Sequence, residues 1–280
     1  YVGYLLANAL TGHTRGWIMG QGHCVAAIEA VNALTGDVSP AQQGRYDRSA
    51  EGLSRLCADF YSYETGPDGL PAAPLGSHAG PNTAGAVSEG GYLGFAELQY
   101  VHMPLPGESL VAFLSDGAFE EQRGSDWAPR WWRTDDSGFS IPVMILNGRR
   151  IEQRTQILQQ GGAEWLAEDV RHNGFEPVIV DGRDPAAIAW AIVEGEDGLR
   201  GFASRADRRY PAPLPYVIAE TEKGFGFPGA GTNAAHNLPL DGNPHLDAGA
   251  RELFNRSAAA LHVPERELHE ALEAFAVHGR

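Results

Sequence analysis

The sequence predicts an α/β fold, with a doubly wound, mainly parallel sheet flanked by helices. The first observation is a series of short Val/Ile/Leu-rich runs bounded by turn residues, at Leu110–Leu114, Ile141–Leu146, Pro177–Asp181 and Tyr216–Glu220. Such runs are typical of buried strands in a parallel sheet. The second is that segments with helical periodicity lie between them, as crossover connections require.

The N-terminal part predicts one further βα unit. A helix is expected over Tyr1–Leu10 and a strand over Gly16–Met19, followed by the glycine-rich turn Gly20–His23 and a helix over Cys24–Leu34. A strand, a glycine-rich turn and a helix in this order bring backbone N–H groups close to a ligand phosphate. A helical stretch is expected over Ser49–Phe60.

The middle of the chain contains one long loop. The first half of Leu75–Tyr100 is rich in Gly, Pro, Ser and Asn, so we expect irregular structure there, with a helix beginning near Gly90. Long loops inside compact α/β domains often carry function. His78 in this loop is therefore a candidate active-site residue, and a surface position is the alternative.

Later segments complete the predicted fold. Thr155–Asn173 is amphipathic and predicts one helical region, and Asp184 can cap a helix that runs to about Val193. Gly198–Pro215 is expected to be a connection. Two helices are expected at the end, over His245–Leu261 and Pro264–Val277. We expect one α/β domain over residues 1–240 and a helical extension packed on it over 241–280.

Composition restricts the class of protein. The net charge of −15 argues against a nucleic-acid backbone as the main partner, because phosphate binding needs basic patches. The sequence contains no run of eighteen apolar residues, so it predicts no membrane span. The only cysteines, Cys24 and Cys57, have no metal-ligand spacing and favour a reducing compartment. We therefore expect a cytoplasmic protein, although the chain begins at Tyr1 and a preceding segment could have been removed.

Two polar residues follow neighbouring predicted strands. Asp116-Gly117 ends the run at Leu110–Leu114, and Asn147-Gly148 ends the run at Ile141–Leu146. Ligands of parallel sheets bind outside the carboxyl ends of the strands. Carboxylate, amide and main-chain carbonyl oxygens suit Mg²⁺, which usually keeps places for water and ligand phosphates. The alternative is that both dipeptides are ordinary turns.

These residues and five other segments resemble the N-terminal, diphosphate-binding domain of the phosphoketolases, in the transketolase superfamily. An Asp-Gly followed about thirty residues later by Asn is similar to the family's GDG…N motif for thiamine diphosphate. The matching segments occur in the family's order: GQGHC (Gly20–Cys24), SHAGPNTAGAVSEGGYLGF (Ser77–Phe95), SDG (Ser115–Gly117), ILNGRRI (Ile145–Ile151), NGFEPVIVDGRDP (Asn173–Pro185), KGFGFP (Lys223–Pro228) and AHNLPL (Ala235–Leu240).

The resemblance implies a set of site residues. The implied catalytic residues are His23, His78, Lys223 and His236. The implied metal ligands for Mg²⁺ are the side chains of Asp116 and Asn147 and the carbonyl of Arg149. The implied contacts to thiamine diphosphate are Gly22, His23, Gly90, Gly91, Asp116, Gly117, Asn147, Lys223 and His236. The implied reaction is the cleavage of a C–C bond in a ketose phosphate through a two-carbon adduct on the thiazolium ring.

Several departures from the family pattern affect the expected activity. Ser115 replaces the first Gly of GDG, Ala118 stands where the family has Glu, Ser88 where it has His, and Asn237 where it has Gln. The resemblance covers about the first third of a family member and lacks the pyrimidine-binding domain. We therefore expect one subunit of a split enzyme, with a separate pyrimidine-domain chain as partner and a hetero-oligomeric assembly.

Two other functions stay open. A split transketolase-like subunit would transfer the acyl or ketol unit to an acceptor other than phosphate. A non-catalytic scaffold would keep the fold and have lost the site, and Ala118 and Ser88 favour it, whereas the retained Asp116, Asn147 and Lys223 count against it. Product analysis distinguishes the transketolase-like subunit from a phosphoketolase-like one. A test of cofactor binding distinguishes the scaffold from both.

Overall fold

The fold is taken from a computed structural model of the chain. The structure describes residues 1–19, 25–36, 38, 40, 42–59, 65–67, 69, 103–122, 133–151, 153–236 and 240–278. Within these ranges the elements are, in chain order, α1 (Val2–Thr11), β1 (Gly16–Met19), α2 (Val25–Thr35), α3 (Ala50–Asp59), β2 (Ser109–Ser115), α5 (Asp116–Gln122), β3 (Phe139–Leu146), β4 (Arg149–Arg150), β5 (Gln153–Arg154), α6 (Gln156–Gln160), α7 (Ala163–His172), β6 (Phe175–Asp181), α8 (Pro185–Ser204), β7 (Leu214–Glu220), η4 (Asn233–His236), α9 (Ala248–Ala260) and α10 (Glu265–His278).

A parallel sheet lies at the centre of the fold. Its strand order is β1-β2-β3-β7-β6, and each neighbouring pair is parallel. The predicted α/β fold with a mainly parallel sheet is therefore confirmed. The strands end in register, because Ser115 lies opposite Ile145 and Leu146 lies opposite Glu220. The residues that follow β2, β3 and β7 consequently emerge at one edge of the sheet.

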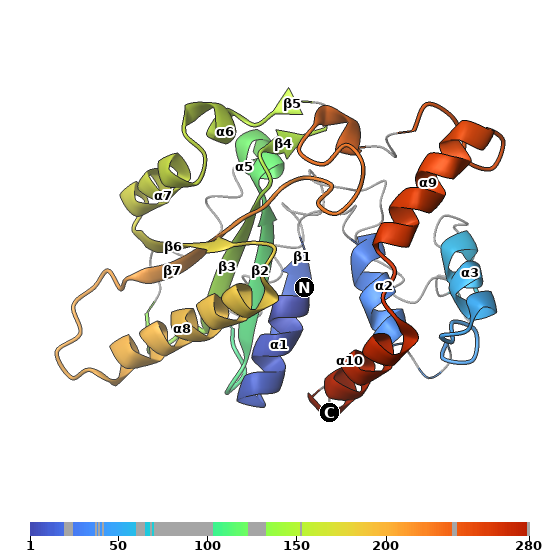
Figure 1. The fold of residues 1–280 in the computed structure, drawn as a ribbon. Coiled ribbons are helices and arrows are strands. Elements are labelled where there is room, and N and C mark those ends of the chain that lie inside the picture. The colour runs from blue at the N-terminus through green and yellow to red at the C-terminus, as the bar shows by residue number, and fades with distance from the viewer. Residues whose placement is uncertain are drawn as a thin grey trace.

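Helices cover both faces of this sheet. The chain moves outward from β3 to β6 through α7 and returns to β7 through α8, and right-handed crossovers in opposite directions place the two helices on opposite faces. Figure 1 shows α6 and α7 on one side, and α8 with α1 on the other. Because both faces are covered, β2 and β3 are apolar along their lengths, with Val111, Ala112 and Ile141 fully buried.

Two helical predictions were wrong in their extent. The segment over Thr155–Asn173 forms two helices instead of one, because Gly161 and Gly162 have positive φ angles of 139° and 69°. The helix after Asp184 runs to Ser204, well past Val193, so much of the predicted connection is helical.

The extension of α8 has a packing reason. Residues three or four positions apart continue one buried stripe, namely Ala189, Ile192, Glu196 and Leu199. Gly195 faces the sheet so closely that an added Cβ atom would lie 3.1 Å from the Cβ atom of Pro215. Gly195 therefore allows close packing against the sheet, and the helix continues past it.

The C-terminal helices lie beside the N-terminal part of the chain. Helix α10 contacts α1 and α2, and Figure 1 shows α9 continuing along the same side of the molecule. The expected division between residues 1–240 and 241–280 stays a prediction. Among the described residues, no helix is both long and apolar enough to cross a membrane.

Candidate active site

Asp116 joins the ends of two neighbouring strands. It directly follows β2, and its side chain is inaccessible to solvent, with 0% exposure. Its Oδ1 atom accepts a hydrogen bond of 2.9 Å from the Gly117 amide, and Oδ2 accepts one of 2.6 Å from the Gly148 amide. The prediction that Asp116 and the Asn147-Gly148 turn meet at one edge of the sheet is therefore confirmed.

The two glycines are required by close approaches and by backbone geometry. A Cβ atom on Gly117 would lie 2.9 Å from the Cβ atom of Arg150 in β4. Gly148 has a φ angle of +72°, and a Cβ atom there would lie 2.8 Å from a terminal methyl of Leu158. Ordinary turns would explain these glycines, but they do not explain a fully buried carboxylate between them.

The carboxyl group of Asp116 has a strongly perturbed acidity. Burial raises its pKa from 3.8 to about 7, although the amides of Gly148, Gly117 and Asn147 act in the opposite direction. The nearby carboxylate of Glu120 raises the pKa further. Within the described parts of the chain, no Lys or Arg side chain forms an ion pair with Asp116. A cation bound there would compensate the buried charge.

The oxygen atoms beside Asp116 are of the type that a divalent ion needs. The Asn147 Oδ1 atom accepts a hydrogen bond of 2.9 Å from the Arg149 amide, which holds the turn in one conformation. The Asp116 carboxylate, the Asn147 amide oxygen and the Arg149 carbonyl are all hard oxygen donors, and each oxygen has a further lone pair. These residues fit a Mg²⁺ ion whose remaining places are filled by water and phosphate oxygens.

Lys223 and His236 form the second part of the site. Lys223 follows β7, and its Nζ atom donates a hydrogen bond of 3.0 Å to the Ile151 carbonyl and lies 2.9 Å from the His236 Nδ1 atom. Burial lowers the pKa of the half-buried Lys223 ammonium; Asp116 acts to raise it and Arg149 to lower it further. The structure thus places these two candidate residues in direct contact, on the loop adjacent to the Asn147 turn.

The sequence reasoning missed several residues that shape this site. The Arg149 guanidinium donates to Asn233 Oδ1 at 2.5 Å and to the Gly231 carbonyl. Ile151, a β-branched residue that carries the carbonyl bound by Lys223, has a φ angle of +44°, which such residues rarely adopt.

A buried acid next to the site was also missed. The Glu120 Oε1 atom accepts a hydrogen bond of 2.6 Å from the Ile157 amide at the start of α6. Its Oε2 atom is buried without a hydrogen-bond partner, and the Arg150 Nη1 atom is 3.9 Å away. Glu120 therefore lies close enough to Asp116 to raise the pKa of that carboxyl group.

The remaining predicted site residues lie outside the described part of the chain. They are Gly22, His23, His78, Gly90 and Gly91, together with the divergent positions Ser88 and Asn237. Their predicted roles stay predictions. The roles assigned to Asp116, Gly117, Asn147, Arg149, Lys223 and His236 also stay predictions, although the structure brings these residues to one edge of the sheet.

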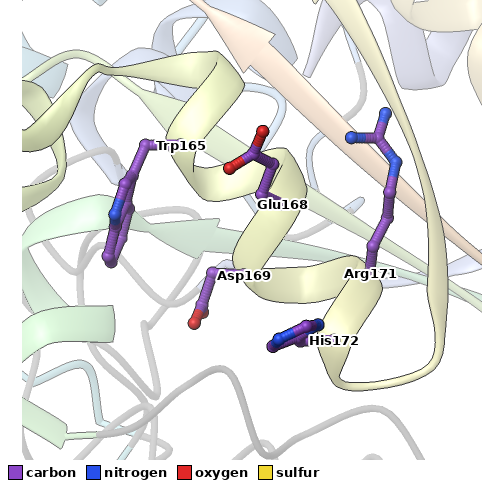
Figure 2. Close-up of a pocket in the computed structure, with 5 residues that line it drawn as sticks. All are labelled: Trp165, Glu168, Asp169, Arg171 and His172. Atoms are coloured by element: carbon purple, nitrogen blue, oxygen red, sulfur yellow. The ribbon is translucent and has the colours of Figure 1, made fainter.

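A surface hollow beside α7 is the other candidate considered. It is lined by Trp165, Glu168, Asp169, Arg171 and His172 (Figure 2). All five belong to one helix, and Figure 2 shows their side chains spreading apart along it. Because no group of these side chains converges on one point, the hollow provides no reacting centre among the described residues.

Three comparisons with known proteins identify the relatives of this chain. A family model described as the XFP N-terminal domain matches residues 13–252. A probable phosphoketolase from Rhodopseudomonas palustris strain TIE-1 is 27% identical over 94% of this chain and 35% of its own length. One from Streptomyces coelicolor is 30% identical over 80% of this chain and 29% of its own length.

A solved structure shares the fold. A transketolase variant from Pichia stipitis matches with a TM-score of 0.54 and 17% identity, over 99% of this chain and 37% of that one. The chain therefore spans about a third of the length of the relatives that it matches.

Proposed function

Because this chain belongs to the XFP N-terminal domain family, we propose that it binds thiamine diphosphate with Mg²⁺ and takes part in phosphoketolase-type cleavage of a ketose phosphate. The observation that supports this most is the buried Asp116 carboxylate, which meets the Asn147-Gly148 turn at the carboxyl edge of the sheet. The phosphoketolase relatives indicate the reaction class, since they match along most of this chain.

In this proposal three oxygen donors hold the metal. They are the Asp116 carboxylate, the Asn147 amide oxygen and the Arg149 carbonyl, with diphosphate oxygens and water in the other positions. The metal would compensate the charge that burial now disfavours at Asp116. When bound, thiamine diphosphate supplies the electron sink that allows a carbon–carbon bond next to a carbonyl to break.

Lys223 and His236 would act on the substrate side. The Lys223 ammonium is a hydrogen-bond donor that can stabilise negative charge on a substrate oxygen. Its contact with the Ile151 carbonyl fixes where the Nζ atom lies. The imidazole of His236, 2.9 Å from that atom, can accept or return a proton near neutral pH. Their proximity allows charge stabilisation and proton transfer at the same substrate group.

A pyrimidine-binding domain outside these 280 residues would complete the cofactor site. Family members place the cofactor between two domains, and the present residues supply donors for the diphosphate and the metal alone. The sequence-based expectation that the second domain lies on a separate polypeptide, in a hetero-oligomer, stays a prediction. So does the expectation of a cytoplasmic location.

Calorimetry tests the proposal directly. Thiamine diphosphate should bind to the chain together with its pyrimidine-binding domain, in a manner that requires Mg²⁺ and is lost in Asp116→Asn. The Asp181→Asn variant is a matched control, because Asp181 ends the edge strand β6 of the same sheet and pairs with Arg183 on the surface. Binding that is unaffected by Mg²⁺ or by Asp116→Asn would show that the metal site is misassigned. No binding at all would favour the scaffold alternative.

Product analysis separates cleavage by phosphate from transfer to another acceptor. With a ketose phosphate and inorganic phosphate, the proposed reaction yields acetyl phosphate. The alternative is supported by the substitutions Ser88 and Ala118, which alter positions near the implied cofactor. A new ketose formed only when an aldehyde acceptor is added, with no acetyl phosphate, would establish transketolase-type transfer instead.

A further inference from the structure

We propose that Arg149 is a positioning residue, whose side chain fixes the loop carrying Lys223 and His236 against the turn that follows β3. Its guanidinium donates to Asn233 Oδ1 at 2.5 Å and to the Gly231 carbonyl. These acceptors are 84 and 82 positions later in the chain. One side chain therefore links two segments that only the fold brings together.

The connection runs in both directions. Arg149 donates from the β4–β5 hairpin to the loop at Gly231 and Asn233, and Lys223 donates from the loop back to the Ile151 carbonyl at 3.0 Å. The Gly231 amide also donates to the Lys223 carbonyl at 2.8 Å, so the acceptor of Arg149 is bonded directly to the lysine. A displacement of Gly231 would consequently be passed to Lys223.

Other interactions of this loop are mainly local. Most of its described backbone hydrogen bonds join residues three positions apart, such as Phe225 to Glu222 and Thr232 to Gly229, and much of it is exposed. The Thr221 amide donates to the Leu146 carbonyl in β3, which anchors only the start of the loop. Turns of this kind set the loop's shape but not its position relative to the sheet. Its side-chain contacts with other elements include Phe227 against Phe254 of α9 and the Arg183 guanidinium over the Phe225 ring. At the end that carries Gly231 and Asn233, the long-range hydrogen bonds of Arg149 and Lys223 hold the loop against the β4–β5 hairpin.

Arginine suits this task better than lysine would. A planar guanidinium presents several N–H groups in a fixed arrangement and can satisfy two separate acceptors, whereas an ammonium is a single point donor. Arg149 also has its own main-chain carbonyl in the predicted metal site. Arg149 therefore contributes a carbonyl to the predicted metal site through its main chain, and holds the loop of Lys223 and His236 through its side chain.

Four variants test this role, and none of the measurements needs cofactor or a partner. Arg149→Ala removes both bonds, Asn233→Ala removes one acceptor and leaves the charge, and Arg149→Lys keeps the charge. Arg154→Ala is the matched control, because Arg154 is an exposed arginine directly opposite Arg149 in the β4–β5 hairpin. Failure of the proposed reaction would leave these measurements unaffected, so the two proposals can be judged separately.

The first readout is amide hydrogen exchange of residues 231–235. Arg149→Ala should accelerate it by about tenfold to a hundredfold, since charge-assisted hydrogen bonds that hold the loop are lost. Asn233→Ala should give a smaller acceleration and Arg149→Lys an intermediate one. Exchange in β2 and β3 should be unchanged, which distinguishes a local displacement from general destabilisation.

The second readout uses the only lysine of the chain. A sample containing lysine labelled with ¹³C at the ε position gives one side-chain signal, from Lys223. That signal should shift in Arg149→Ala and in Asn233→Ala, but not in Arg154→Ala. A shift in Asn233→Ala cannot come from a lost charge, so it reports on the position of the loop.

The proposal is overturned if Arg149→Ala and Asn233→Ala both match Arg154→Ala in loop exchange and in the Lys223 signal. Should Arg149→Ala not fold, Asn233→Ala and Arg149→Lys decide the matter, because Asn233 is exposed and its truncation removes no buried group. Wild-type behaviour of those two variants would then refute the role of Arg149.

Discussion

The carboxylate of Asp116 accepts a hydrogen bond of 2.6 Å from the backbone amide of Gly148, thirty-two positions later in the chain. This bond connects the carboxyl ends of β2 and β3 at the place where the proposed metal would bind. Backbone amides compensate part of the negative charge, but burial still raises the pKa of Asp116 to about 7. We therefore expect the metal-free protein to be less stable when Asp116 is ionised than when it is protonated.

Replacing Asp116 by Asn should stabilise the metal-free protein at alkaline pH. A folded-state pKa of about 7, against 3.8 in the unfolded chain, means that the folded state binds the proton more tightly. The contribution of this carboxyl group to the free energy of unfolding is then fully present below pH 3.8 and is lost as pH rises through 7. The loss is on the order of 4 kcal/mol. Asparagine cannot ionise, so urea unfolding with EDTA should find the variant more stable at pH 8 and nearly equal to wild type at pH 4.

The exposed Asp181 provides the control for this measurement. Its hydrogen bonds with Arg183 lower its pKa to about 2, so its ionised form is the favoured one in the folded state. Asp181→Asn should consequently gain no stability at pH 8. Parallel pH profiles for Asp116→Asn and wild type would contradict the assigned pKa of Asp116.

Metal binding should release a proton in acidic solution. Since Mg²⁺ needs the ionised carboxylate, its apparent affinity should rise about tenfold per pH unit below pH 7 and level off above it. Calorimetry in two buffers of different ionisation enthalpy should find about one proton released per metal at pH 6 and close to none at pH 8. EDTA should reverse the binding. An affinity that does not vary with pH between 5 and 7 would mean that Asp116 is not the ligand that titrates.

Two helical glycines should respond to alanine with opposite signs. A Cβ atom on Gly117 would lie 2.9 Å from the Cβ atom and 3.5 Å from the Cα atom of Arg150, so Gly117→Ala must push β4 away from α5. The expected loss of stability is about 1–3 kcal/mol. Gly198 in α8 has no atom within 4 Å of an added Cβ atom, and Gly198→Ala should stabilise by about 0.5–1 kcal/mol.

Urea unfolding measures both effects. Gly117→Ala should also weaken Mg²⁺ binding, because β4 begins at Arg149, whose carbonyl is a proposed ligand. If Gly117→Ala is as stable as wild type and binds Mg²⁺ equally well, the close approach of α5 and β4 is not a determinant of this site.

The central strands were predictable because their sequences have one physical explanation. The runs containing Val111 and Ile141 are buried on both faces, and only a covered parallel sheet accounts for such runs. The extent of α8 was not predictable in the same way. Gly195 and Gly198 suggest a connection, and only the contact of Gly195 with Pro215 shows that a glycine is needed within a helix there.

In the site too, features set by local sequence could be predicted, whereas contacts between distant segments could not. Asp116 and Asn147 could be placed from sequence because each directly follows a strand, and strand ends share an edge. The side-chain role of Arg149 depends on Gly231 and Asn233, which belong to a loop whose position no local pattern determines. Likewise, no spacing in the sequence predicts the positive φ angle of Ile151.

Removing one partner of the buried ion pair between Arg15 and Glu196 should strongly destabilise the fold. The Arg15 Nε and Nη2 atoms donate to Glu196 Oε1 and Oε2 at 2.7 and 2.8 Å, and both side chains have 0% exposure. Ser109 in β2 donates to the same carboxylate at 2.9 Å. Burial alone would raise the pKa of Glu196, but the bonds and charge of Arg15 outweigh it, so the pKa is lowered.

Glu196→Gln would leave the Arg15 charge buried without a counter-ion. Removing one partner of such a pair costs about 3–5 kcal/mol, so the urea midpoint should fall steeply at pH 7. Asp197→Asn is the matched control, since Asp197 is the next residue, is exposed, and binds Arg200 at 2.8 Å. A surface pair of this kind contributes about 1 kcal/mol or less. Equal losses in the two variants would show that the Arg15–Glu196 pair has no special role in joining α1, β2 and α8.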